Sequence, residues 1–517
     1  MKITCLGHAG LLIETESTSI LCDPWFNEAY LNSWIPFPSN EHVEKDKLLH
    51  CDFLFISSSG QDRCDVEFLG RVDKAATVIL PDFKSFNLQN ILIDLGFCNF
   101  IHTPNDIVFK LTNSLEIIVS VNNSNVYGAM PTATIAIGDG MNNIFVQTNQ
   151  LEKTSKDMTT FEQYDIHFAQ ITAPGWYPMV TENPELIKDI LSKQLRNEQM
   201  QRFLEVIKTF DAKVVVPYGG PPCFLDKDLF YLNDIDSFET GSKLFVDANT
   251  AVKYLQNNGI ENTLLVYPET EIVIKGNLIK FTTPNLQSNG LDIAYVDKKS
   301  YLTSLASKRR NENTPDRERP TTDLLKQSYL LEKLREFIGP IIPELNLIRT
   351  GLNGRILIST HTESVVIDLL DLTIEKFSGQ LCRFKFYIED DVLKRAIKSS
   401  NNEAFKALFY SCRFATESDG FNNDLVYAFL MALSPEAIEN LEAVLEKMPK
   451  ISDEIEINGY RIQRYCPHLK ADLNQYGQID QNILTCTVHG WQFDLESGKC
   501  TTQDDRKLFV KKLSNKK

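Results

Sequence analysis

The sequence predicts a multidomain α+β protein, with a large sheet-rich region first, a smaller mixed domain next and an all-β domain at the C-terminus. The 517 residues exceed what a single hydrophobic core usually supports. Short β-rich runs alternate with turn signals over residues 1–265, and the composition changes near residues 298–322 and again at residue 451. These changes divide the chain into segments 1–265, 266–322, 323–450 and 451–517.

The overall composition is that of a folded globular protein, with 43% hydrophobic and 24% charged residues. A formal charge of −16 argues against nucleic acid as a partner. No run of eighteen apolar residues and no export signal is visible, so we expect a cytoplasmic protein without a membrane span. Eleven cysteines, an odd number without a disulfide framework, are expected to be reduced thiols.

Segment 1–265 is expected to be dominated by strands and to carry two amphipathic helices late in its length, at residues 184–210 and 250–257. Its expected strands are residues 2–6, 11–14, 19–22, 53–57, 77–80, 116–121, 132–137 and 213–217. More short strands follow to about residue 297. Residues 298–322 are so polar that we expect a mobile surface segment or linker, and we favour a solvated loop over a basic docking patch.

Segment 323–450 is interpreted as a compact mixed α/β domain. Helices are expected at residues 324–338, 391–399 and 435–447, and strands at 356–359, 364–368 and 382–388. Residues 384–387 and a short strand at 411–414 are interpreted as core and sheet rather than as the lining of a pocket. At residue 451 a strand pair around Asn458-Gly459 predicts a hairpin, and with it the start of the last domain.

Two pairs of metal-ligand residues lie in this last segment. Cys466-Pro467-His468 is followed, after seventeen residues, by Cys486-Thr487-Val488-His489. Two thiolates on one iron and two neutral imidazoles on the other complete the coordination of a 2Fe-2S cluster of the Rieske type. Zinc modules more often space their ligands as C-x2-C and H-x3-H, so a zinc site and a chance grouping of core residues are the weaker alternatives. The predicted cluster ligands are Cys466, His468, Cys486 and His489.

Residues 455–508 resemble Rieske proteins of the oxygenase and ferredoxin branch. The resemblance rests on the ligand pairs and on Ala471-Asp472-Leu473, Gly490-Trp491, Phe493-Asp494 and Ser497-Gly498-Lys499-Cys500. The extra cysteine that cytochrome bc-type Rieske proteins carry in each loop is missing. The resemblance implies an all-β Rieske domain, a lower-potential 2Fe-2S cluster, and an electron donor such as a ferredoxin, a cytochrome or a flavin reductase.

The N-terminal segment resembles the metallo-β-lactamase fold. The resemblance is carried by Gly7-His8-Ala9-Gly10 followed by a strand, by Cys22-Asp23-Pro24-Trp25, by Gly175-Trp176-Tyr177-Pro178-Met179 and by Pro217-Tyr218-Gly219-Gly220-Pro221-Pro222-Cys223-Phe224-Leu225-Asp226. It implies an αββα sandwich. Together with a Rieske domain it is similar to CMP-N-acetylneuraminate hydroxylase, in which, however, the Rieske domain comes first.

The metal motif of that family is degenerate here. Where the family shows H-x-H-x-D-H, this chain has Ser58-Ser59-Gly60-Gln61-Asp62-Arg63. Only Asp62 survives, and the fixed positive charge of Arg63 would repel a metal cation, so we expect no second metal in this domain. His8 and Asp62 are weak candidates for a catalytic pair. The alternatives are a structural histidine and an aspartate that only caps a turn.

Three functions remain open at this point. The first is an oxidoreductase that passes single electrons to a hydroxylase-like or monooxygenase-like site acting on an unknown small molecule. The second is an electron-transfer or redox-sensing protein with a non-catalytic lactamase-like scaffold. The third and weakest is a metallo-hydrolase, since the loop at residues 58–63 lacks the histidines that such an enzyme needs.

Overall fold

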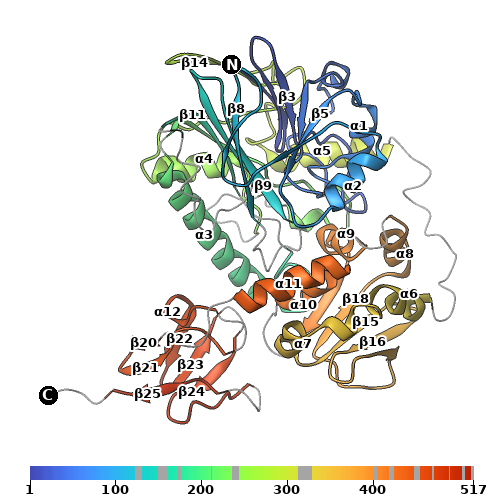
Figure 1. Cartoon of the computed structure of the whole chain (residues 1–517). Helices are drawn as coiled ribbons and strands as arrows, with labels where there is room; N and C mark the ends of the chain where they lie inside the picture. Colours follow the sequence, from blue (N-terminus) through green and yellow to red (C-terminus); the bar gives the residue numbers. More distant parts are fainter. Residues whose placement is uncertain are drawn as a thin grey trace. The chain divides into compact units, whose positions relative to one another are not determined.

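The structure is a computed structural model, shown in Figure 1. It describes residues 1–122, 131–148, 161, 163–171, 176–210, 212–233, 235, 244–311, 329–399, 404–418, 424–447, 454–467, 471–487, 490–502 and 507–513. The chain divides into two compact units. Unit 1 is mainly Met1–Asn125, Met130–Thr322 and Ala407–Arg413, and unit 2 is mainly Asp323–Lys406 and Phe414–Lys517.

Unit 1 is built on two β-sheets. The eight-stranded sheet has the order β14-β13-β1-β2-β3-β4-β5-β6 and the six-stranded sheet the order β12-β11-β10-β9-β8-β7. The strands of the first are β1 (Lys2–Gly7), β2 (Gly10–Glu14), β3 (Ser19–Cys22), β4 (Phe53–Phe55), β5 (Thr77–Pro81), β6 (Phe100–Thr103), β13 (Glu271–Lys275) and β14 (Leu278–Thr282). Those of the second are β7 (Val108–Lys110), β8 (Glu116–Asn122), β9 (Thr132–Gly138), β10 (Asn143–Gln147), β11 (Tyr164–Gln170) and β12 (Ala212–Tyr218).

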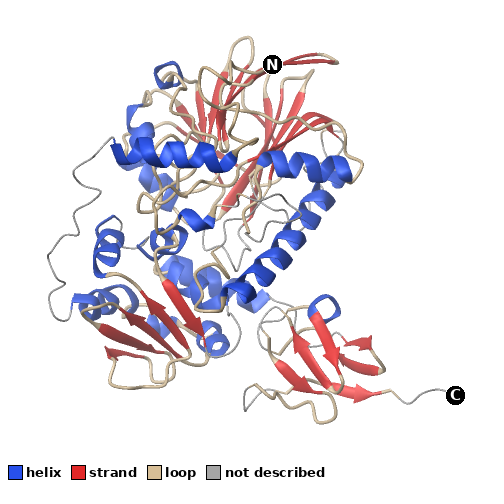
Figure 2. Cartoon of the chain, turned by 180° about the vertical axis from the view of Figure 1, so that it is seen from behind, coloured by secondary structure: helices blue, strands red, loops and turns tan. Residues whose placement is uncertain are grey.

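The two sheets pack face to face, and helices cover their outer faces (Figure 2). Inward side chains of both sheets, such as Ile13 and Ile166, share one apolar core. Helices α1 (Val66–Arg71) and α2 (Asn87–Asp94) cover the first sheet, whereas α3 (Glu185–Thr209) and α4 (Ala248–Asn257) cover the second. The predicted αββα sandwich is confirmed, and the two helices expected late in the segment are α3 and α4.

The polar stretch expected to be a mobile linker is, up to residue 311, a helix. Helix α5 spans Lys298–Asn311 and buries Tyr301, Leu302 and Ala306 against unit 1. Arg309 forms ion pairs with Glu28 and with Asp226. The expectation was wrong for this part because three buried apolar residues, with ion pairs for some of the charged ones, are enough to dock a strongly charged helix. Residues 312–322 lie outside the described residues.

The segment Ala407–Arg413 belongs to unit 1 although it lies far along the chain. Trp34 Nε1 donates a hydrogen bond of 2.6 Å to the Tyr410 carbonyl, and Arg413 pairs with Asp226 and Asp228. The short strand expected at residues 411–414 is wrong. Helix α9 (Ala404–Ser411) ends there, Cys412 has a left-handed φ of 58°, and strand β19 begins only at Ala415.

Unit 2 contains a five-stranded sheet with the order β17-β16-β15-β18-β19. Its strands are β15 (Arg355–Ser359), β16 (Ser364–Asp368), β17 (Thr373–Lys376), β18 (Phe384–Tyr387) and β19 (Ala415–Ser418). Its helices are α6 (Tyr329–Ile338), α7 (Leu347–Leu352), α8 (Asp390–Ser399), α10 (Asp424–Met431) and α11 (Pro435–Lys447). Phe384 and Phe386 are buried core residues of β18, as expected for a sheet position.

The last part of unit 2 consists of two three-stranded sheets and one short helix. The sheets have the orders β20-β21-β25 and β22-β23-β24. Their strands are β20 (Glu454–Ile457), β21 (Tyr460–Gln463), β22 (Gly477–Asp480), β23 (Ile483–Cys486), β24 (Gln492–Asp494) and β25 (Val510–Lys512), and the helix is α12 (Leu473–Tyr476). Asn458 and Gly459 both have positive φ between β20 and β21, which confirms the predicted hairpin turn.

In the part of the chain that the structure describes, none of the helices combines the length and the apolar character needed to cross a membrane.

Candidate functional site

Two of the four predicted cluster ligands belong to the same buried core of the C-terminal β region. Cys466 follows β21 and Cys486 ends β23, and both side chains are completely buried. They pack in one core with Trp491 and Phe493, and neither forms a disulfide. Buried reduced thiols in one core are suitable ligands for iron, since the thiolate is the form that binds metal.

Each cysteine stands at the base of a loop that closes on itself. The Cys466 amide donates to the Ala471 carbonyl at 2.8 Å, and the Cys486 amide donates to the Trp491 carbonyl at 2.8 Å. Gly490 has a φ of 60°, a left-handed conformation that a residue without Cβ adopts at little cost. The described residues therefore fit a 2Fe-2S cluster. His468 and His489, the other two predicted ligands, lie outside the described residues.

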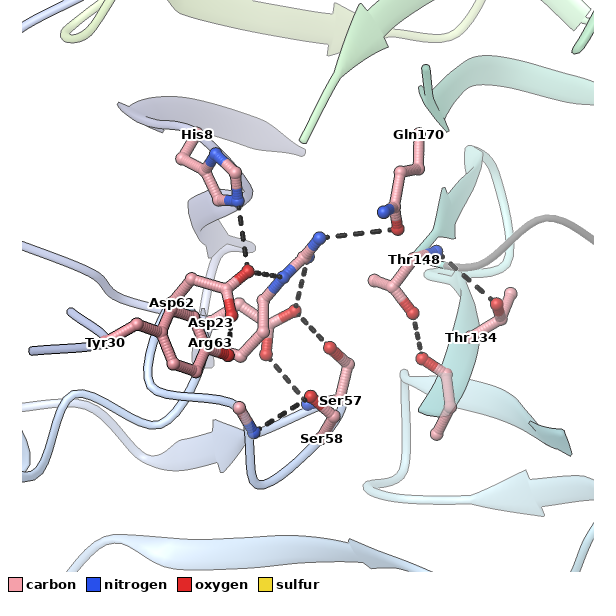
Figure 3. A network of polar contacts seen from close by, with 12 residues as sticks. His8, Asp23, Tyr30, Ser57, Ser58, Asp62, Arg63, Thr134, Thr148 and Gln170 are labelled. Carbon is pink, nitrogen blue, oxygen red and sulfur yellow. Dashed lines mark hydrogen bonds and ion pairs between the residues drawn. The ribbon is translucent and has the colours of Figure 1, made fainter. Parts of the chain in front are cut away.

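The second candidate site lies in unit 1, where Figure 3 shows a network of polar contacts around the loop at residues 58–63. His8 comes from the turn between β1 and β2, Asp23 follows β3, and Asp62 and Arg63 belong to the loop after β4. Because β3 and β4 are neighbouring parallel strands, their carboxyl ends bring Asp23 next to Arg63. The fold thus gathers residues that are up to 55 positions apart in sequence.

The Arg63 guanidinium lies among oxygen atoms. Nη1 lies 3.3 Å from Asp23 Oδ2, Nε lies 3.4 Å from Asp62 Oδ2, and Nη2 donates to Gln170 Oε1 at 3.3 Å. Burial alone would lower the pKa of Arg63, but the two carboxylates outweigh it and raise that pKa. The guanidinium therefore stays charged and supplies the positive charge of the site. Gln170, at the end of β11, gave no signal in the sequence.

Asp23 is held from a second side by Ser57. The Ser57 amide donates to Asp23 Oδ1 at 2.7 Å and the Ser57 hydroxyl donates to Oδ2 at 2.6 Å. Burial raises the pKa of Asp23, while Arg63 and Ser57 act in the opposite direction without cancelling it. Both oxygens of this carboxylate are therefore already engaged by the protein.

His8 and Asp62 do meet, as the sequence suggested. His8 Nε2 lies 3.3 Å from Asp62 Oδ2, and the Tyr30 hydroxyl donates to Asp62 Oδ1 at 2.8 Å. Burial opposes the ionisation of Asp62, but the His8 hydrogen bond and the Arg63 charge hold its pKa well below the usual range. Burial lowers the pKa of His8 and keeps the ring neutral. Asp62 joins three side chains rather than merely capping a turn, and Tyr30 is a partner that sequence patterns did not reveal.

A small pocket, partly open to solvent, adjoins this network. His8 and Tyr218 both line it, beside glycines and aromatic residues. Within the described residues, His8 Nδ1 has no hydrogen-bond partner, and the Tyr218 hydroxyl lies close to the positive charge of Arg63. The remaining lining residues are Cys5, Gly7, Gly10, Leu11, Phe37, Pro38, Phe168, Pro217, Gly219, Gly220, Ala248, Val266, Tyr267, Pro268 and Tyr295.

Two family models match unit 2. The model described as "Rv3818-like, SCP2-like domain" matches residues 330–447, and the model described as "Rieske [2Fe-2S] domain" matches residues 448–511. The second match contains all four predicted ligands, and it shows that the cofactor of this domain is a 2Fe-2S cluster.

Several solved structures resemble roughly the first half of the chain. An isothiocyanate hydrolase from Delia radicum gut bacteria is 15% identical, with a TM-score of 0.37, over 53% of this chain and all of that one. The diiron β-hydroxylase CmlA of Streptomyces venezuelae is 16% identical, with a TM-score of 0.36, over 55% of this chain and 54% of its own. Likenesses at this level carry no conclusion about activity.

Full-length relatives are known from mycobacteria. The protein Rv3818 of Mycobacterium tuberculosis, provisionally named a Rieske 2Fe-2S iron-sulfur protein, is 31% identical over 98% of this chain and 99% of its own length. A protein of the same name from Mycolicibacterium smegmatis is 31% identical over 99% of this chain and all of its own. With the buried cysteine pair and the Rieske domain match, these relatives show that the chain belongs to the Rv3818-like family of Rieske 2Fe-2S iron-sulfur proteins.

Proposed function

We propose that the protein is an oxidoreductase that transfers single electrons through a 2Fe-2S cluster held by Cys466, His468, Cys486 and His489. The observation that carries the proposal is the pair of completely buried, reduced cysteines, each at the base of a self-closing loop in one apolar core. When bound, the cluster supplies one-electron chemistry at a potential above that of all-cysteine plant-type ferredoxins.

The chain's own residues contribute shielding and positioning to this function. Trp491, Phe493 and Leu484 pack around the two cysteines and are nearly or completely buried, which keeps water away from the sulfurs. A dry, rigid surrounding limits how far protein atoms and water move when the cluster gains or loses an electron. The electron donor that fits such a domain is a small redox partner of the ferredoxin, cytochrome or flavin reductase class.

The destination of the electron divides the proposal into two versions. A hydroxylase-like or monooxygenase-like enzyme would need a second, oxygen-activating centre, and His8 with Asp62 beside the pocket is the candidate place for its small-molecule substrate. However, the carboxylates of Asp23 and Asp62 are already engaged by Arg63, Ser57, Tyr30 and His8. This network favours the other version, an electron-transfer or redox-sensing protein in which unit 1 is a scaffold. It also makes a metallo-hydrolase the weakest alternative.

Metal and sulfide analysis of protein purified without oxygen tests the proposal. About two irons and two sulfides per chain, with an EPR signal of a Rieske cluster after reduction, are expected for a single cluster. Colourless protein, or zinc in place of iron, would contradict it. More than two irons per chain would support the enzyme version with a second centre and would contradict the scaffold version.

A further inference from the structure

The two cluster loops begin at Cys466 and at Cys486 and end at Ala471 and at Trp491. A short path of polar contacts through α12 connects them. The path begins at Arg464, directly before the Tyr465-Cys466 pair. Arg464 Nε and Nη2 both donate to Asp472 Oδ2, at 3.0 and 2.9 Å. This contact bridges the two ends of the first loop, which are also joined by an antiparallel bridge between Tyr465 and Asp472 and by the Leu473 amide bound to the Arg464 carbonyl at 2.7 Å.

Asp472 also holds the start of α12. Its second oxygen, Oδ1, accepts a hydrogen bond of 3.0 Å from the Asn474 amide, and its carbonyl accepts one of 2.8 Å from the Tyr476 amide. One carboxylate thus fixes the arginine that precedes the first loop and the helix that follows it. Two N–H groups of the Arg464 guanidinium donate to the same carboxylate oxygen, Oδ2. Because the guanidinium is planar, such a contact fixes its orientation better than a lysine–carboxylate pair would.

The far end of α12 binds the second loop. The Tyr476 carbonyl accepts two hydrogen bonds from Thr487, one from the amide at 2.8 Å and one from the hydroxyl at 3.0 Å. Thr487 directly follows Cys486. The contacts therefore run from Arg464 through Asp472 and α12 to Thr487, and they join the residues next to the two buried cysteines.

We infer that Asp472, together with Arg464 and Thr487, sets the spacing and orientation of the two cluster loops, so that these three are positioning residues of the 2Fe-2S site. The inference rests on the proposed cluster function. It adds that geometry at the cluster depends on a brace made by side chains that are not themselves ligands. Loss of an outer partner of this kind typically weakens metal retention by about ten-fold or more.

Charge and position can be separated, because Asp472 and Arg464 have opposite signs. Asp472→Asn removes a negative charge and Arg464→Gln removes a positive one, so a purely electrostatic role predicts reduction potentials that move in opposite directions. A brace predicts that both variants lose iron to a chelator about ten-fold faster than the wild type and that both alter the EPR g values of the reduced cluster. Thr487→Val, which removes only the hydroxyl, should also speed iron loss and alter the g values, but by a smaller amount. Thr487→Ser keeps the hydroxyl and should behave like the wild type.

Arg461→Gln is the matched control. Arg461 lies in β21 and makes an exposed ion pair of 2.7 Å with Glu456 of the neighbouring strand β20, and neither residue takes part in the contacts between the two loops. Its iron loss and EPR signal should equal those of the wild type. Opposite potential shifts with unchanged iron loss in the Asp472 and Arg464 variants would overturn the inference while leaving the cluster assignment intact. Wild-type protein that takes up no cluster would contradict the proposed function itself.

Discussion

The site in unit 1 and the site in the C-terminal β core differ in what neutralises their buried donor atoms. In unit 1 the protein supplies its own cation, since the Arg63 guanidinium lies 3.3 Å from Asp23 and 3.4 Å from Asp62. In the C-terminal core the buried donors are the sulfurs of Cys466 and Cys486. Buried thiolates need a positive partner, which an iron cluster provides. The comparison teaches that the same requirement, a positive partner for buried negative donors, is met by a side chain of the protein in unit 1 and by a cofactor in the C-terminal core.

Removing a sulfur should have the largest effect. Cys466→Ser is expected to reduce iron from about two atoms per chain to about none, because a hydroxyl is a poor replacement for a thiolate at iron. Iron and sulfide analysis of anaerobically purified protein measures this loss. Cys98→Ser, at an exposed cysteine in unit 1, is the control and should keep its iron. Equal iron contents in the two variants would refute the assignment of Cys466.

Removing the internal cation should be the next largest effect. Arg63→Ala leaves two buried carboxylates without their counter-charge, and breaking a buried ion pair from one side typically costs about 3–5 kcal/mol. Urea unfolding of the full chain, monitored by tryptophan fluorescence, measures the loss of unfolding free energy. Trp25 lies close to the site, with its ring centre 4.8 Å from that of His8. Arg71→Ala breaks an exposed pair with Asp46 and should cost about 1 kcal/mol or less. Similar losses in both variants would mean that Arg63 is not the counter-charge of the site.

These two sites also show how far the sequence could be interpreted. The four residues predicted to bind the cluster form two pairs, each within four residues, and this local spacing is typical of a single cofactor. The network in unit 1 was only partly visible. His8, Asp62 and Arg63 fall on motif positions, but Gln170 lies 107 residues from Arg63 and carries no pattern of its own.

Contacts over long sequence distances explain the other differences. Tyr410 packs on Tyr30 with ring centres 4.9 Å apart, and Tyr30 in turn binds Asp62. A segment some 380 residues further along the chain therefore supports the network, and no local periodicity could indicate this. Helix α5 was missed for a related reason, because its ion pairs with Glu28 and Asp226 come from distant loops.

Replacing a predicted histidine ligand of the cluster with cysteine sharpens the comparison between the two sites. His489→Cys is expected to lower the reduction potential by on the order of 100 mV, because a thiolate adds negative charge where a neutral imidazole stood. Redox titration followed by EPR measures the shift. Cys500→Ser changes a nearby thiol that is not a predicted ligand, and its potential should stay at the wild-type value. An unchanged potential in a His489→Cys protein that still binds a cluster would count against His489 as a ligand.

The smallest effect concerns a histidine that serves the fold rather than a metal. His167 lies in the core of unit 1, where burial lowers its pKa from 6.5 to about 3, and its Nε2 contacts Gln147 Oε1 at 2.8 Å. The folded state therefore keeps His167 neutral, whereas the unfolded chain takes up a proton below pH 6.5. The unfolded state binds more protons in this window, so stability must rise with pH between about 3 and 6.5 and is lost as the pH falls.

Between pH 7 and pH 5 this single group should cost about 2 kcal/mol of unfolding free energy, from about 1.4 kcal/mol per pH unit below 6.5. Urea unfolding of the wild type at both pH values measures the difference. His167→Gln should reduce it by about that amount, whatever the variant's absolute stability. His102→Gln, at an exposed side chain of β6, should leave the pH dependence as it is in the wild type. If His167→Gln kept the full wild-type dependence on pH, a proton on the buried imidazole could not be its source, and the acid sensitivity would have to come from other groups.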